Sequence, residues 1–244
     1  RTFITVAKSA MPALPEPAEV FRIEHRRDER QWIAEVEDRL AELALPSDAV
    51  CLLAAVHQRA AGTLRSAVLN HHPWAQIKVL TRADIAIEVD VTEPTRVGID
   101  RLLNALAVNQ VRAAERPAIV VDMGTAMTVN LISARGVFEG GAIYAGPMTA
   151  LGALHTATSS LPLLGPNVLE SPPPPVGKST DEAMAAGAYW GAVGAARQLI
   201  ERMAATCSEP PEVFLTGGAA KGLAPHVGLE SRPARHLPQL VLSG

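Results

Sequence analysis

Asp122 ends an apolar run and is followed closely by a glycine and a threonine, in the stretch AIVVDMGTAMTVNLISARG over 118–136. The periodicity predicts two strands, over 118–121 and 128–132, with the residues from Asp122 to Thr125 as the tight turn between them. The backbone of such a turn is a candidate phosphate-binding site if a second element faces it. The first question is therefore which other part of the chain lies opposite this turn.

Asp100 stands between an extended segment and an amphipathic helix, in the stretch RVGIDRLLNAL. Two interpretations of this carboxylate are open. Asp100 can be the N-cap of the helix, which is a common role for aspartate. It can also be a functional carboxylate at a strand-to-helix junction, where Gly98 admits a ligand and Arg101 supplies a positive charge.

The stretch FLTGGAAKGL over 214–223 predicts a strand, a glycine pair and the start of a helix. Glycines at such a turn let the backbone approach a flat ring or a phosphate closely. Gly217 and Gly218 are therefore candidate nucleotide-binding residues, although glycine turns after strands are also common without any ligand.

The stretch VGKST resembles the end of a P-loop, but Pro172 stands where that pattern needs a glycine, and prolines offer no N–H to a phosphate. The P-loop interpretation is therefore excluded. Ser179 followed by Glu182 instead predicts a helix start with a capping box. The neighbouring Lys178 and Thr180 could also face a ligand at that helix N-terminus.

The helix predicted after this cap carries Gly187, Gly191 and Gly194 at intervals of four and three residues. Each glycine inside a helix costs about 1 kcal/mol relative to alanine. Three such costs on one face predict a close approach to another helix or subunit; the alternative is that the glycines are merely tolerated.

The remaining apolar patterns alternate between strands and helices, which predicts an α/β fold with mixed sheets flanked by helices. We expect an N-terminal subdomain over 1–113 and a C-terminal subdomain over 114–244. The elements expected are strands near 1–6, 49–56, 77–80, 138–146, 213–215 and at the C-terminal LPQLVLSG, and helices over 27–43, from about 62, after Asp100, near 148–158 and from 180.

Composition excludes several functional classes. Basic and acidic residues are balanced in both parts, 14 against 15 up to residue 113 and 8 against 10 beyond it, so no basic footprint for nucleic acid is present. Cys51 and Cys207 form no C-x-x-C pair, and the seven histidines show no metal-ligand spacing. No apolar stretch is long enough to cross a membrane, and a reducing cytoplasm is the expected setting.

Taken together and in order, these motifs resemble those of the type III pantothenate kinases, which belong to the acetate and sugar kinase/Hsp70/actin superfamily. The resemblance runs from about residue 49. The segments that carry it are TEPTRVGIDR, VVDMGTAMT, GGAIYAG, VGKSTDEAMAAGAYWGAVG and FLTGGAA. It implies the actin/Hsp70/sugar-kinase-like duplicated domain with the nucleotide between the halves.

The resemblance also implies ATP-dependent phosphorylation of pantothenate, by a homodimer with the substrate pocket at the subunit interface. Mg²⁺ and a monovalent cation, K⁺ or NH₄⁺, are the implied cofactors. In this interpretation Asp100 accepts the proton and Asp122 holds the monovalent cation. The remaining implied contacts are Gly98, Ile99, Asp100, Arg101 and Thr180 for pantothenate and Asp122, Gly124, Thr125, Gly217 and Gly218 for ATP.

The sequence departs from the family pattern at several points. The family's first phosphate hairpin, Asp-x-Gly-Asn-Thr/Ser, is expected just upstream of Arg1. Val91 stands where the family usually has an aromatic residue, and Glu93 where it has asparagine. Two alternatives follow: a non-catalytic transcription-accessory regulator on the same scaffold, and a kinase for another small hydroxy acid.

Overall fold

A computed structural model describes residues 2–6, 19–23, 29–43, 50–55, 58–229 and 232–243. Its elements are β1 Thr2–Val6, β2 Glu19–Ile23, α1 Glu29–Glu42, β3 Val50–Leu53, α2 Gln58–His71, β4 Gln76–Val79, η1 Arg82–Asp84, η2 Pro94–Arg96, α3 Ile99–Val111, β5 Ala118–Met123, β6 Ala126–Ile132, β7 Phe138–Ala145, α4 Pro147–Ala157, η3 Pro166–Leu169, α5 Thr180–Ala204, β8 Glu212–Thr216, α6 Ala220–Leu223, η4 Ala224–His226, β9 Gly228–Leu229, β10 Arg232–Pro233, β11 Arg235–His236 and η5 Leu240–Leu242.

A five-stranded sheet in the order β11-β8-β5-β6-β7 organises the second half of the chain. β5 pairs antiparallel with β6, and β6 pairs antiparallel with β7. β8 pairs in parallel with both β5 and β11. The sheet is therefore mixed, and the α/β class expected from the sequence is confirmed.

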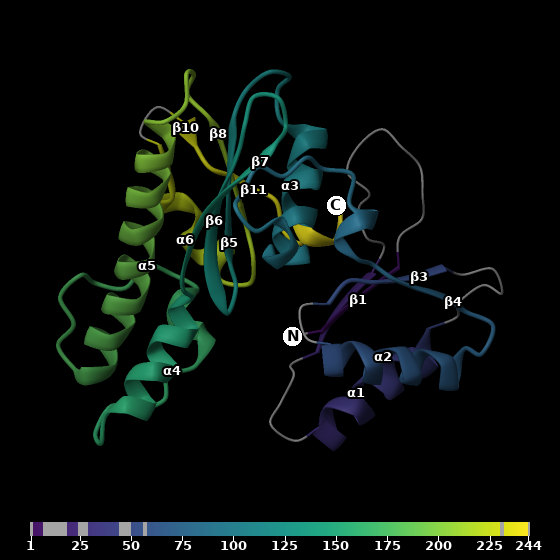
Figure 1. The fold of residues 1–244 in the computed structure, drawn as a ribbon. Helices are drawn as coiled ribbons and strands as arrows, with labels where there is room; N and C mark the ends of the chain where they lie inside the picture. The colour runs from purple at the N-terminus through teal and green to yellow at the C-terminus, as the bar shows by residue number, and fades with distance from the viewer. Residues whose placement is uncertain are drawn as a thin grey trace.

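Helices cover both faces of this sheet, with α5 on one side and α3 on the other (Figure 1). The alternation of side chains along β5 explains the arrangement. Ile119, Val121 and Met123 pack in one core cluster with α5, whereas Ala118 and Val120 pack in another with α3. The β5 side chains in both clusters are fully buried from solvent, so β5 lies at the centre of the fold.

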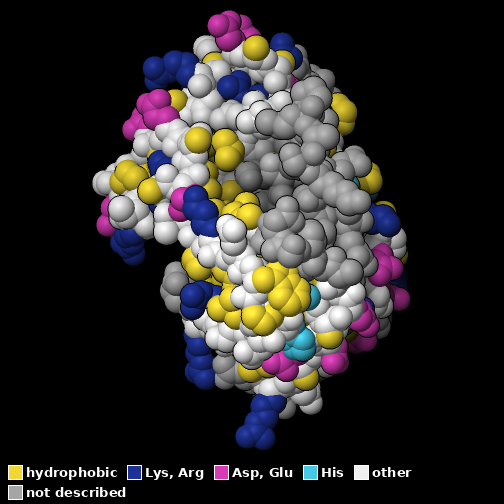
Figure 2. Space-filling view, turned by 90° about the vertical axis from the view of Figure 1, so that its right-hand side faces the viewer, with side chains coloured by type: hydrophobic (Ala, Val, Ile, Leu, Met, Phe, Trp, Pro, Cys, Tyr) yellow, Lys and Arg dark blue, Asp and Glu magenta, His cyan; other side chains and the backbone are white. Residues whose placement is uncertain are grey.

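The first part of the chain forms smaller units: β1 pairs antiparallel with β2, and β3 pairs parallel with β4. Trp32, Val36 and Leu40 of α1 are buried against α2 in a separate core cluster. Figure 2 views this side of the molecule and shows hydrophobic side chains at the surface; Trp74, before β4, is half exposed.

The expected division near residue 113 stays a prediction. Helix α3 precedes that position in the chain, yet its apolar face belongs to the core of the five-stranded sheet. The packing therefore assigns α3 to the C-terminal core although the sequence division places it in the N-terminal part.

The strand expected in LPQLVLSG is wrong, because residues 240–242 form the 3₁₀ turn η5. Gln239 has a left-handed backbone with φ of 61°, which interrupts any extended segment. Leu240 is then buried beside α3, and its N–H donates to Thr216 Oγ1 at 3.3 Å. The last strand of the sheet is instead the short β11.

No helix among the described ranges is both long enough and apolar enough to cross a membrane.

Candidate functional site

The turn between β5 and β6 consists of Gly124 and Thr125, because both strands are longer than the sequence pattern predicted. The Gly124 N–H donates to Ala126 O at 3.1 Å, which closes the turn. The Thr125 carbonyl accepts from Gly146 N at 3.0 Å and from the Thr149 hydroxyl, so the start of α4 fixes the turn from outside. The Thr125 side chain itself is exposed and free to contact a ligand.

The glycine turn after β8 lies directly beside this hairpin. In the parallel pairing of β5 and β8, Thr216 is the register partner of Asp122, so both strands end at the same edge. Gly217 has φ of +98°, and a Cβ on it would lie 2.5 Å from Asp122 Oδ1. The Ala219 N–H also donates to Met123 O at 3.1 Å. The two predicted nucleotide elements, far apart in sequence, therefore meet, with Gly218 exposed on the turn.

Asp122 sits in an environment that opposes its charge. Burial raises the pKa of its carboxyl and the negative charge of Asp100 raises it further, while a hydrogen bond from Asn104 lowers it. The Asn104 amide nitrogen donates to Asp122 Oδ2 at 3.0 Å. Asn104 was missed by the sequence reasoning; its signal was the spacing of four residues from Asp100, which places both on one face of the helix.

Asp100 does not cap α3, so the N-cap interpretation is wrong. Gly98 occupies the cap position, and Asp100 lies in the first turn. Its Oδ1 accepts from the Arg101 N–H at 2.9 Å and lies 2.5 Å from where a Cβ on Gly98 would be. The carboxylate therefore folds back over Gly98, beside the partly buried Ile99.

Arg101 is held by two groups on the neighbouring strands. Its Nε donates to Asn130 Oδ1 at 2.7 Å, and its guanidinium carbon lies 5.3 Å from the centre of the Phe138 ring. Burial lowers the pKa of Arg101 and the charge of Asp100 opposes this, but an arginine stays protonated throughout the physiological range. Asn130 and Phe138 were also missed by the sequence reasoning.

Thr180 is not brought together with Asp100 within one chain. It is the first residue of α5 and lines a groove with Leu151 and Leu154 of α4. Helix α5 packs on the face of the sheet opposite to α3, so the sheet lies between these two helices (Figure 1).

Half of the predicted capping box at the start of α5 is formed. The Glu182 N–H donates to Ser179 Oγ at 3.2 Å, so Ser179 is the N-cap. The Glu182 carboxylate, however, accepts from the Lys178 N–H at 2.6 Å rather than from Ser179. The helix start is thus satisfied by its own residues.

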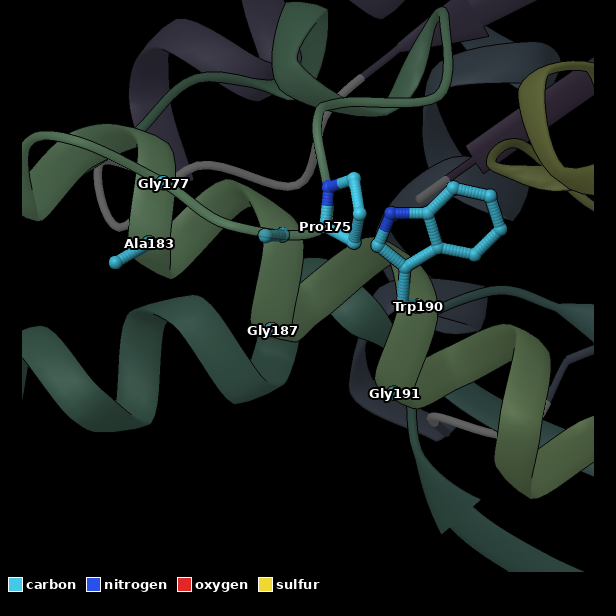
Figure 3. Close-up of a pocket in the computed structure, with 7 residues that line it drawn as sticks. Pro175, Gly177, Ala183, Gly187, Trp190 and Gly191 are labelled. Carbon is cyan, nitrogen blue, oxygen red and sulfur yellow. The ribbon is translucent and has the colours of Figure 1, made fainter.

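Gly187, Gly191 and Gly194 are exposed, and nothing described in this chain lies within 4 Å of a Cβ placed on them. A close approach by another helix of the same chain is therefore not seen in the described ranges, and contact with a second subunit stays a prediction. Gly187 and Gly191 line an open groove of about 460 Å³. Figure 3 shows them there together with Trp190 and Pro175.

The described residues contain no group of three or more His, Cys, Asp and Glu side chains that could hold a metal ion. A cation beside Asp122 would therefore need further oxygen ligands of another kind, such as backbone carbonyls, hydroxyls, water or its ligand. The adjacent glycine turn packs tightly against the end of β5, because a Cβ on Gly217 would lie 2.5 Å from Asp122 Oδ1 and 2.6 Å from Met123 N.

The two positions that depart from the family pattern lie before α3 and have different surroundings. The Val91 side chain packs with the α3 cluster, 3.3 Å from the Cβ position of Gly140. Glu93 is exposed and pairs with Arg96 at 2.9 Å.

The family model described as type III pantothenate kinase matches residues 5–202. A type III pantothenate kinase from Phenylobacterium zucineum is 34% identical over 189 residues, which cover 78% of this chain and 71% of the relative. One from Acidiphilium cryptum is 37% identical over 75% of this chain and 69% of the relative. One from Persephonella marina is 27% identical over 82% of this chain and 77% of the relative. The polyphosphate/ATP-glucomannokinase from Arthrobacter sp. strain KM aligns at 12% identity over 93% of this chain and 85% of its own, with a TM-score of 0.41, too low to support an argument.

Proposed function

The chain belongs to the type III pantothenate kinase family, and from that premise we propose that it transfers the terminal phosphoryl group of ATP to the hydroxyl of pantothenate, the first step of coenzyme A biosynthesis. The observation that carries the proposal is that α3, which carries Asp100, is bonded through Asn104 to Asp122 at the end of β5, beside the glycine turn at Gly217. In phosphoryl transfer to a hydroxyl, a carboxylate beside the bound phosphates can orient the acceptor and take its proton.

At the acceptor side, Asp100 is the group that takes the proton from the pantothenate hydroxyl. Its Oδ1 already accepts from the Arg101 N–H, which holds the side chain in one orientation. Gly98 and Ile99 shape the adjacent wall, and Arg101 offers its guanidinium to the negatively charged end of the acceptor. A positioned base of this kind contributes about 10² to 10⁴ to the rate.

At the nucleotide side, the turn residues Gly124 and Thr125 and the glycines 217 and 218 surround the space for ATP. Mg²⁺ and a monovalent cation, K⁺ or NH₄⁺, would neutralise phosphate charge when bound, with Asp122 as the protein ligand of the monovalent cation. Asn104 holds one oxygen of Asp122, so its other oxygen, Oδ1, is the one that faces the glycine turn.

We propose further that the active form is a cytoplasmic homodimer in which Thr180 of one copy completes the acceptor site of the other. Two observations support this. The sheet separates Thr180 from Asp100 within one chain, and the glycine face of α5 is open. A second copy can approach the backbone of α5 closely where no side chain stands.

The direct test is mass-spectrometric detection of phosphopantothenate after incubating the full-length protein with ATP, Mg²⁺, K⁺ and pantothenate. We expect product with K⁺ and much less without it. Absence of product from folded protein would contradict the proposal and favour the non-catalytic regulator.

A panel of small hydroxy acids separates the remaining alternative, because Val91 leaves the acceptor pocket without the aromatic contact of the family. Pantothenate should show the highest kcat/KM of the panel. A higher value for another acid would identify a kinase of the same fold with a different substrate.

A further inference from the structure

Arg101 carries the positive charge at the candidate acceptor site, and a flexible arginine on a helix has no preferred direction of its own. In this chain it has one, because buried groups on β6 and β7 contact it. Neither group is among the site residues predicted from the sequence.

Asn130 is the first of them and is fully buried at 0% exposure. Its Oδ1 accepts from Arg101 Nε at 2.7 Å, and its Nδ2 donates to Thr128 Oγ1 at 3.1 Å. Because Arg101 can only donate, Oδ1 must face it, and the bond to Thr128 uses the other end of the amide. The amide is therefore fixed at both ends.

Phe138 is the second group and is also fully buried. The Arg101 guanidinium carbon lies 5.3 Å from its ring centre, within the range of a cation–π contact. A hydrogen bond at Nε and a ring against the guanidinium together restrict both the position and the orientation of the planar group. The two terminal nitrogens have no hydrogen-bond partner among the residues that the structure describes, so they remain available to a ligand.

Asn130, which holds Arg101, is connected through β6 to the β5–β6 hairpin, the candidate nucleotide-binding element. Thr128, which holds Asn130, is the register partner of Asp122 across the β5–β6 pair, and β6 begins directly after Thr125. Strand β6 therefore sets the position of the Arg101 guanidinium relative to the β5–β6 hairpin. Productive transfer requires that the acceptor be placed to within a fraction of an ångström.

We propose that Asn130 is a positioning residue for the acceptor: it orients Arg101 so that the terminal N–H pair binds the carboxylate of the substrate. The inference rests on the proposed function, and it assigns selectivity for an acidic acceptor to a buried amide that does not touch the substrate. Bidentate binding of a carboxylate by arginine depends on such a fixed fork.

The test compares pantothenate with panthenol, the analogue in which an alcohol replaces the carboxylate. Asn130→Leu should raise the KM for pantothenate about tenfold or more, the size expected for a lost hydrogen bond to a charged group. The kcat, the KM for ATP and the KM for panthenol should change little. Asn130→Asp keeps the acceptor oxygen for Nε and should stay within about threefold of the parent protein.

Two controls separate positioning from general damage. Asn109→Leu removes a comparable amide from α3 that instead bonds Gly136 O, and it should leave the KM for pantothenate unchanged. In an Arg101→Leu background, Asn130→Leu should have no further effect on this KM, because its action runs through Arg101. Equal losses for pantothenate and panthenol, or additive effects in that background, would overturn the inference.

A last measurement separates this inference from the proposed function. The Arg101 Nε–H proton, followed by NMR without any substrate, should exchange slowly in the parent protein and rapidly in Asn130→Leu. If this dependence holds while pantothenate is not phosphorylated, the proposed function fails and the positioning by Asn130 stands. If exchange is the same in both proteins, the inference fails whatever the turnover.

Discussion

Asn104 on α3 donates a 3.0 Å hydrogen bond to Oδ2 of Asp122 at the end of β5. The Asn104 carbonyl oxygen, by contrast, is buried and has no partner among the described residues. An unsatisfied buried carbonyl costs stability. Asn104 therefore orients the Asp122 carboxylate, while its own carbonyl oxygen is left without a hydrogen bond in the core.

Replacing Asn104 by aspartate should destabilise the fold by about 2 kcal/mol or more, because a second carboxylate would face the buried Asp122. Urea unfolding at pH 7 measures this. Asn109→Asp is the matched control on the same helix; there the new carboxylate keeps Arg112 Nε as its donor, so the loss should be smaller. Equal losses in the two variants would contradict the expectation.

Asp100→Asn should lower kcat by about 10² to 10⁴ with the circular dichroism spectrum unchanged, because the amide cannot accept the proton of the hydroxyl. Phosphopantothenate production under saturating ATP is the measurement. An unchanged rate would remove Asp100 from the role of base.

Gly217→Ala should destabilise the protein by about 1 to 3 kcal/mol and weaken ATP binding, since the new methyl would meet Asp122 and Met123 in a left-handed backbone. Gly152→Ala, inside α4 with nothing within 4 Å of its Cβ position, should instead be neutral or stabilising by up to about 1 kcal/mol. Thermal unfolding and calorimetric ATP titration of both variants test the contrast.

Mixing two inactive variants tests the shared acceptor site. If Thr180 acts in trans, a mixed dimer of Asp100→Asn and Thr180→Val contains one site with both defects and one site with none. Co-folded mixtures should then recover activity that neither variant shows alone. A mixture no more active than the sum of its components would place the site within one chain.

The ion pair at η1 predicts a pH-dependent term in stability. Lys78 Nζ lies 2.6 Å from Asp84 Oδ1, and this pair, with the Thr81 bonds, holds the pKa of Asp84 well below its usual range. A lowered carboxyl pKa stabilises the fold above the ordinary pKa, and this contribution is lost as the pH falls towards the folded value. Asp84→Asn should lower Tm at pH 7, with the difference shrinking below about pH 4. A constant difference across this range would contradict the assignment.

The sequence predicted the local elements of the site well, because turn glycines and apolar alternation are encoded within a few residues. The β5–β6 hairpin and the glycine turn at Gly217 are the examples. Asn130 could not be found in this way, and the helical spacing of Asn104 from Asp100 did not reveal its partner Asp122, because both contacts depend on which strand lies beside α3. Arg101 and Asn130 are 29 residues apart, and periodicity reports that a side chain is buried without naming its partner.

Thr180 is a second case in which the local structure could be predicted but the tertiary placement could not. Its position at a capped helix start was predictable, but the side of the sheet on which α5 packs was not. The residues 118–121 of β5 are apolar on both faces, so this run does not indicate in the sequence which face α5 will cover.

β5 is paired on both edges and covered on both faces, and this central position affects how the protein unfolds on heating. Amide protons of such a strand exchange with solvent only when the whole domain opens. The carboxylate at its end is therefore among the last features to lose its geometry. We therefore expect the geometry at Asp122 to be lost together with the cooperative unfolding of this half of the chain.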